Sequence, residues 1–68
     1  MNRRFPKTGE IWRDPRGPFL VTAEHKLTSR DKSVGYVCSL SVLDMTDGVI
    51  AHNWYVSDRM LEEMTFVA

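Results

Sequence analysis

The sequence predicts a single small all-β domain of about five antiparallel strands, with one short helical turn before the last strand. The chain has 68 residues, which is enough for only one hydrophobic core. Apolar and polar residues alternate along residues 34–43, as they do in a half-buried strand. The Asp47-Gly48 pair then separates this segment from a second apolar segment, and that arrangement is typical of a tight β-hairpin.

The first part of the chain predicts an arm and two strands. Residues 1–8 lack apolar periodicity, so we expect a flexible N-terminal arm before a domain that covers residues 9–68. A short strand over residues 10–13 ends at Asp14-Pro15-Arg16-Gly17-Pro18, where aspartate, proline and glycine stand at positions that a type I turn prefers. Alternation of apolar and polar residues predicts the next strand over residues 19–26.

The second part predicts a loop, a hairpin, a helical turn and a closing strand. Residues 27–33 are polar and aperiodic, so we expect a mobile hairpin loop. The strands over residues 34–43 and 49–56 pair through the Asp-Gly turn. Residues 59–64 place their apolar side chains on one face of a helical turn, and residues 65–68 form the last short strand.

Charge and cysteine content restrict the function classes. Nine basic and nine acidic residues balance, so the whole chain has no net attraction to nucleic acid or anionic lipid. Residues 1–32 nevertheless hold eight basic and four acidic residues, and residues 33–68 hold one and five. These charges either pair between strands or form one basic face. A single cysteine and the lack of a long apolar run indicate a soluble cytoplasmic protein, with no membrane span and no cofactor.

Side chains capable of catalysis do not form a recognisable pattern. Cys38 could be a nucleophile served by His25 or His52, but it lies on the apolar side of its strand, where a cysteine usually behaves as a small buried hydrophobe. Both histidines with Cys38 could also form a metal site, but none of the three shows short ligand spacing. His52 is in phase with the apolar residues of its strand, which predicts a buried, hydrogen-bonded histidine, with a pH-sensitive contact as the alternative. The acids Asp44, Asp47, Glu62 and Glu63 are expected to form a solvated face. We therefore predict neither an enzyme nor a metal site.

Aromatic residues give the strongest indication of a binding surface. Trp54 and Tyr55 are neighbours in a strand and point to opposite faces, so at least one ring should reach the surface. Exposed rings near the arginines of the first turn could stack on a partner. The predicted binding residues are Trp12, Arg13, Arg16, Tyr36, Trp54 and Tyr55.

Two resemblances extend this interpretation. Residues 6–12 and 17–21, PKTGEIW and GPFLV, resemble the N-terminal half of ribonuclease toxins related to MazF and PemK. This chain lacks the length for the toxins' C-terminal helix, so their catalytic residues are not carried over. Residues 6–68 resemble small SH3-like barrel domains of bacteria and phages, which share the Gly-x-Ile-Trp first strand, the aromatic strand and the short helical turn. This resemblance implies a barrel but no particular activity.

Three functions follow as hypotheses. The first is a non-enzymatic module that binds a protein partner as an adaptor, regulator or inhibitor. The second is a nucleic-acid-binding small barrel, which requires the basic half of the chain to gather on one face. The third is a reduced toxin-like ribonuclease. The oligomeric state stays open, since the long strand or the last strand could pair across a two-fold axis in a homodimer.

Overall fold

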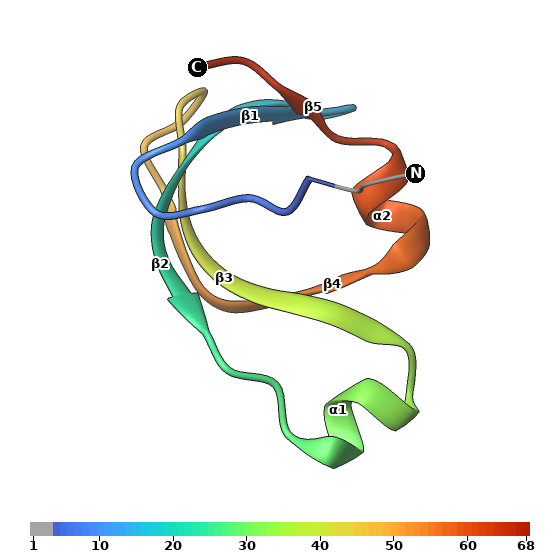
Figure 1. Ribbon diagram of the computed structural model, residues 1–68. Helices are drawn as coiled ribbons and strands as arrows, with labels where there is room; N and C mark the ends of the chain where they lie inside the picture. Colours follow the sequence, from blue (N-terminus) through green and yellow to red (C-terminus); the bar gives the residue numbers. More distant parts are fainter. Residues whose placement is uncertain (1–3) are drawn as a thin grey trace.

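The computed structural model describes residues 4–68 and has one five-stranded antiparallel sheet with two short helices (Figure 1). The elements are β1 (Ile11–Asp14), β2 (Gly17–His25), α1 (Ser29–Ser33), β3 (Tyr36–Asp44), β4 (Ile50–Ser57), α2 (Asp58–Glu62) and β5 (Thr65–Phe66). The strand order is β4-β3-β2-β1-β5. This confirms the predicted all-β fold and the short helix before the last strand. Within residues 4–68, neither helix is long and apolar enough to cross a membrane.

The sheet is strongly bent, and β4 and β5 are its two edges. Figure 1 shows β2 and β3 curving along their length, so that one end of the sheet folds over toward α2. The pairing of β2 with β3 shifts register between Val21 and Ala23, where β2 contains one extra residue. Such bulges increase local twist and bend. Bending brings the β1–β2 turn and β4 to opposite sides of one opening.

The β1–β2 turn forms where the sequence predicts it. Asp14 pairs with Gly17 across the turn, and the Asp14 carboxylate accepts hydrogen bonds from the backbone N–H groups of Arg16 at 2.8 Å and Gly17 at 3.2 Å. Gly17 has a φ of +133°, and an added Cβ would lie 3.0 Å from the Thr46 hydroxyl. Only glycine fits this position without strain.

The segment predicted as a loop contains helix α1, which is a correction to the sequence interpretation. Thr28 and Asp31 form a capping box: the Thr28 hydroxyl accepts from the Asp31 backbone at 3.1 Å, and the Asp31 carboxylate accepts from the Thr28 backbone at 3.0 Å. This reciprocal pair stabilises a helix that buries no side chain. Strand β3 therefore begins at Tyr36 rather than Val34, and Val34 is 66% exposed.

The core lies on the inner face of the bent sheet, under α2. Its buried apolar side chains are Trp12, Phe19, Val21, Leu40, Val42, Val56, Leu61 and Met64, with Cys38 and Met60 packed against them. Trp12 is only 4% exposed, so its prediction as a surface binding residue is wrong. The reason is its register, because Trp12 lies opposite Phe19 on β2 and Phe66 on β5. Its indole N–H is satisfied by Glu10 at 3.0 Å.

A bulge in β4 determines which of its side chains face inward. Val42 pairs with Ala51 and Leu40 pairs with Trp54, so β4 has one residue more than β3 over this stretch. Asn53 lies within it at a φ of +53°. The extra residue changes the phase of the alternation, and Ala51 and Trp54 both face the core side. His52 is exposed, so the prediction of a buried histidine is wrong.

The described part of the predicted arm, residues 4–8, lies against the domain; residues 1–3 are outside the described part of the chain. Glu10 accepts hydrogen bonds from the Arg4 guanidinium at 2.6 Å and from the Lys7 backbone at 2.9 Å. Glu24 accepts from both the backbone and the hydroxyl of Thr8 at 3.0 Å. The hydrogen bond from the Trp12 indole N–H is the largest cause of a lowered pKa at Glu10, and the bonds from Lys7 and Arg4 lower it further. The two bonds from Thr8 lower the pKa of Glu24.

Candidate functional site

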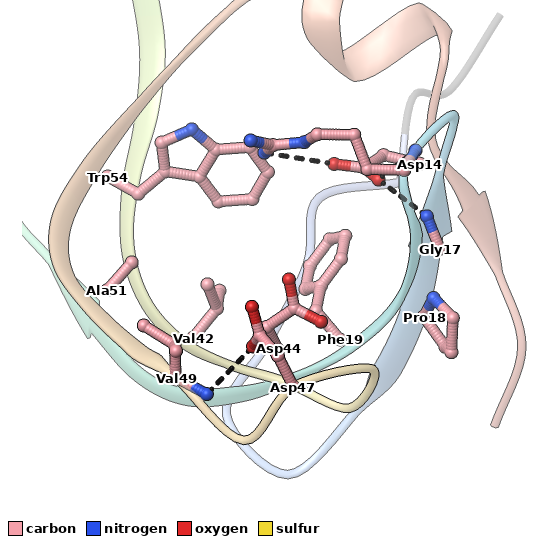
Figure 2. A pocket seen from close by; sticks show the side chains of 11 residues that line it. Asp14, Gly17, Pro18, Phe19, Val42, Asp44, Asp47, Val49, Ala51 and Trp54 are labelled. Atoms are coloured by element: carbon pink, nitrogen blue, oxygen red, sulfur yellow. Dashed lines mark hydrogen bonds and ion pairs between the residues drawn. The ribbon is translucent and has the colours of Figure 1, made fainter.

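Two cavities share Asp14, Arg16 and Trp54 among their lining residues, and we refer to the two together as the groove. The first, which we call the hairpin pocket, has a volume of about 310 Å³ and lies between the β1–β2 turn and the β3–β4 hairpin (Figure 2). It is lined by Asp14, Arg16, Gly17, Pro18, Phe19, Val42, Asp44, Asp47, Val49, Ala51 and Trp54. The second, the helix pocket, has a similar volume of about 310 Å³ and extends toward α2. It is lined by Asp14, Pro15, Arg16, Trp54, Met60, Glu63 and Met64.

Trp54 forms the central wall of the groove. The β4 bulge directs it to the core side, where its ring meets the Phe19 ring edge-on at 5.3 Å between centroids and 87° between planes. The side chain is half-buried rather than enclosed. An indole that is held on one side and open on the other can take part in apolar and stacking contacts with a ligand.

Arg16 lies beside this ring. Its guanidinium carbon lies 5.7 Å from the centre of the Trp54 ring, and its ion pair with Asp14 spans 3.4 Å. The Arg16 side chain is 76% exposed. An exposed ion pair of this length contributes little to stability. The Arg16 side chain therefore lines the groove but can be displaced with little loss of free energy.

Two carboxylates stand across the hairpin pocket from Trp54. Figure 2 shows Asp44 and Asp47 projecting into the opening opposite the indole. One oxygen of Asp44 accepts the backbone N–H of Thr46 at 2.8 Å, and one oxygen of Asp47 accepts the backbone N–H of Val49 at 2.9 Å. These bonds within the hairpin fix both side chains before any ligand arrives.

The convergence of these two acids was not predicted from the sequence. Asp44 and Asp47 were expected on a solvated face, but the hairpin brings both to the same pocket, and Glu63 lines the other pocket. The sequence signal that could have predicted the direction of these side chains is local. Aspartates that precede a turn often bond the backbone two residues ahead, and this fixes the direction of the side chain.

The six predicted binding residues separate into four groups. Arg16 and Trp54 come together in the groove, whereas Trp12 is in the core. Arg13 is exposed on β1 and lines neither pocket. Tyr36 and Tyr55 contact each other, with ring centroids 5.1 Å apart.

The two tyrosines belong to the outer face of the sheet. Tyr55 is 40% exposed and lies opposite Ser39, one position out of phase with Trp54. Of the neighbouring rings in β4, Tyr55 is therefore the more exposed, and Trp54 is the ring in the groove.

Cys38 and Ser41 are both withdrawn from solvent to different degrees. Burial raises the pKa of the Cys38 thiol to about 11, so almost no thiolate exists at neutral pH. His25 Nε2 lies 2.7 Å from the Ser41 hydroxyl, but Ser41 is 4% exposed and out of a substrate's reach. Among residues 4–68, no group of three or more His, Cys, Asp or Glu side chains could hold a metal ion.

Comparison with known proteins adds no assignment. No protein-family model matches this chain, and no curated protein or solved structure is significantly similar to it. The geometry of the groove is therefore the basis for a functional proposal.

Proposed function

We propose that this chain is a non-enzymatic, SH3-like binding module that engages a protein partner through the groove around Arg16 and Trp54. The observation that carries this proposal is the half-buried Trp54 ring, which is shared by two pockets. Tryptophan and arginine are the residue types that most often dominate binding energy at protein interfaces. Here they lie together on the walls of a preformed groove.

The size and lining of the groove favour side chains of an extended segment. Each pocket is close to the lower end of the range for ligand sites, roughly 300 Å³. Apolar walls from Phe19, Val42 and Ala51 in one pocket and from Met60 and Met64 in the other can each receive one or two side chains. A segment of a protein partner can place successive side chains in both.

The charge of the groove disfavours the alternative of nucleic-acid binding. Asp44 and Asp47 line one pocket and Glu63 lines the other, and a phosphate backbone would be repelled by all three. Arg16 is the only base among the groove residues, and it is already beside Asp14. A basic nucleic-acid surface would have to lie elsewhere on the molecule.

A pull-down from a lysate of the source organism, with and without nuclease, tests the proposal. We expect a partner protein that remains after nuclease treatment, is lost with Trp54→Ala and with Arg16→Ala, and is kept with Tyr55→Ala, a matched aromatic change on the outer face. Circular dichroism verifies that each variant is folded. Recovery that disappears with nuclease, or loss only with Tyr55→Ala, would contradict the proposal.

A further inference from the structure

The two walls of the hairpin pocket differ in charge, and this difference identifies the kind of segment it accepts. Its lining contains three carboxylates and one guanidinium. Asp14 is engaged by Arg16 and by the backbone of its own turn. Asp44 and Asp47 are on the opposite wall, so the uncompensated negative charge lies on the β3–β4 hairpin.

Both hairpin carboxylates keep an oxygen for a ligand. Asp44 uses Oδ1 for the Thr46 N–H, and Asp47 uses Oδ1 for the Val49 N–H. Within residues 4–68, neither Oδ2 makes a hydrogen bond or an ion pair. Carboxylates that are already oriented lose little freedom when a cation arrives, and a charge-assisted hydrogen bond is about twice as strong as a neutral one.

The helix pocket has a different character. Met60 and Met64 contribute to its lining, and methionine side chains adapt to apolar groups of varied shape. In an extended chain, side chains two residues apart lie on the same side, about 6.8 Å from each other. Because the two pockets share the Trp54 ring, we expect two such side chains of one segment to enter them, one in each.

We infer that the groove binds an extended protein segment in which a lysine or arginine enters the hairpin pocket, between Asp44 and Asp47, and an apolar residue two positions away enters the helix pocket. This inference rests on the proposed function, since it names the segment that the same groove accepts. The cation is matched by the unpaired oxygens of the hairpin, and the apolar residue by the methionines and the Trp54 ring.

A random dodecapeptide library displayed on phage, selected against the purified chain, tests this inference. We expect the selected peptides to share a basic residue with an apolar residue two positions before it or two positions after it. Affinities of synthetic peptides are then measured by fluorescence anisotropy for wild type, Asp44→Asn and Asp47→Asn. Each variant should weaken binding at least about tenfold, since the lost charge-assisted contact is of roughly 1.5 kcal/mol or more.

Matched controls isolate charge from folding. Asparagine keeps an oxygen acceptor, so both hairpin variants can retain their turn bonds. Asp31→Asn makes the same change in the α1 capping box, away from the groove, and should leave affinity unchanged. Replacing the peptide's lysine with glutamine should weaken binding to wild type but not to the Asp44→Asn/Asp47→Asn double variant, because the paired contact is then already absent.

The outcomes separate the two proposals. Peptides that depend on Trp54 but show no basic preference, or that bind both hairpin variants as well as wild type, would overturn the inference and leave the groove as a binding site. A selection that yields no peptide whose binding is lost with Trp54→Ala would overturn the proposed function itself.

Discussion

Replacing Asn53 should reveal how strongly the β4 bulge fixes the groove. Asn53 adopts a φ of +53°, in the left-handed region that asparagine and glycine tolerate and β-branched residues do not. Asn53→Val should therefore lower the free energy of unfolding by about 1–2 kcal/mol. Asn53→Gly should change it by no more than about 0.5 kcal/mol, because glycine enters this region freely but loses more entropy on folding.

Urea unfolding followed by circular dichroism measures this difference. For a small domain, the free energy of unfolding falls by roughly 1 kcal/mol per molar urea. The midpoint of Asn53→Val should thus decrease by about 1–2 M, whereas that of Asn53→Gly should stay close to wild type. The indole N–H resonance of Trp54 should shift in Asn53→Val and keep its position in Asn53→Gly.

The sign of the valine effect decides between two descriptions of β4. In a regular exposed edge strand, valine is preferred over asparagine, and the substitution would be neutral or stabilising. An Asn53→Val variant as stable as wild type, with an unchanged Trp54 resonance, would refute the account of how the bulge directs Trp54.

Three further predictions concern buried and titratable groups. Cys38 should react slowly with a thiol reagent at pH 8 unless the chain is unfolded, and fast labelling of the native protein would contradict this. Because the folded pKa of the Cys38 thiol, about 11, exceeds its ordinary value of 9.0, the free energy of unfolding should fall as pH rises from 9 toward 11. Acidification below the ordinary carboxyl pKa of 4.5 should release residues 4–8, since the lowered pKa values of Glu10 and Glu24 favour folding only while these carboxyls are ionised. Hydrogen exchange at the Thr8 amide, corrected for its intrinsic rate, should increase at pH 3. Unchanged protection would count against the role of these bonds. Ser39→Ala should leave the free energy of unfolding unchanged or raise it by up to about 1 kcal/mol, because the buried Ser39 hydroxyl has no hydrogen-bond partner among the described residues. Ser41→Ala should lower it by about 1 kcal/mol through loss of the His25 contact. Thermal melts compare the two variants, and a larger loss of stability with Ser39→Ala would contradict this prediction.

The strands were predictable because their signals are local. Alternation and turn residues suffice for the β1–β2 turn, the β3–β4 hairpin and α2, each of which depends on residues close in sequence. Helix α1 was missed because it buries no side chain and its side-chain cap is the local pair of Thr28 and Asp31. A short helix of this kind has no apolar periodicity to detect.

The candidate site was only partly predictable because it depends on register. The sequence interpretation named Arg16 and Trp54 among its binding residues, and the structure brings both to the groove. Regular alternation could not anticipate the bulge that puts Trp54 and His52 out of phase. It also could not distinguish Trp12, which is buried in the core, from an exposed ring. These outcomes are decided by pairing between strands rather than by the order of residues in one strand.

The position of the binding surface is tested most directly by backbone and indole ¹⁵N–¹H NMR spectra recorded during titration with a selected dodecapeptide. We expect shift changes that concentrate at residues 14–19, 44–51 and 60–64 and at the Trp54 indole, with little change at Tyr55. Changes confined to the outer face, around Ser39 and Tyr55, would contradict the assignment of the groove as the binding site.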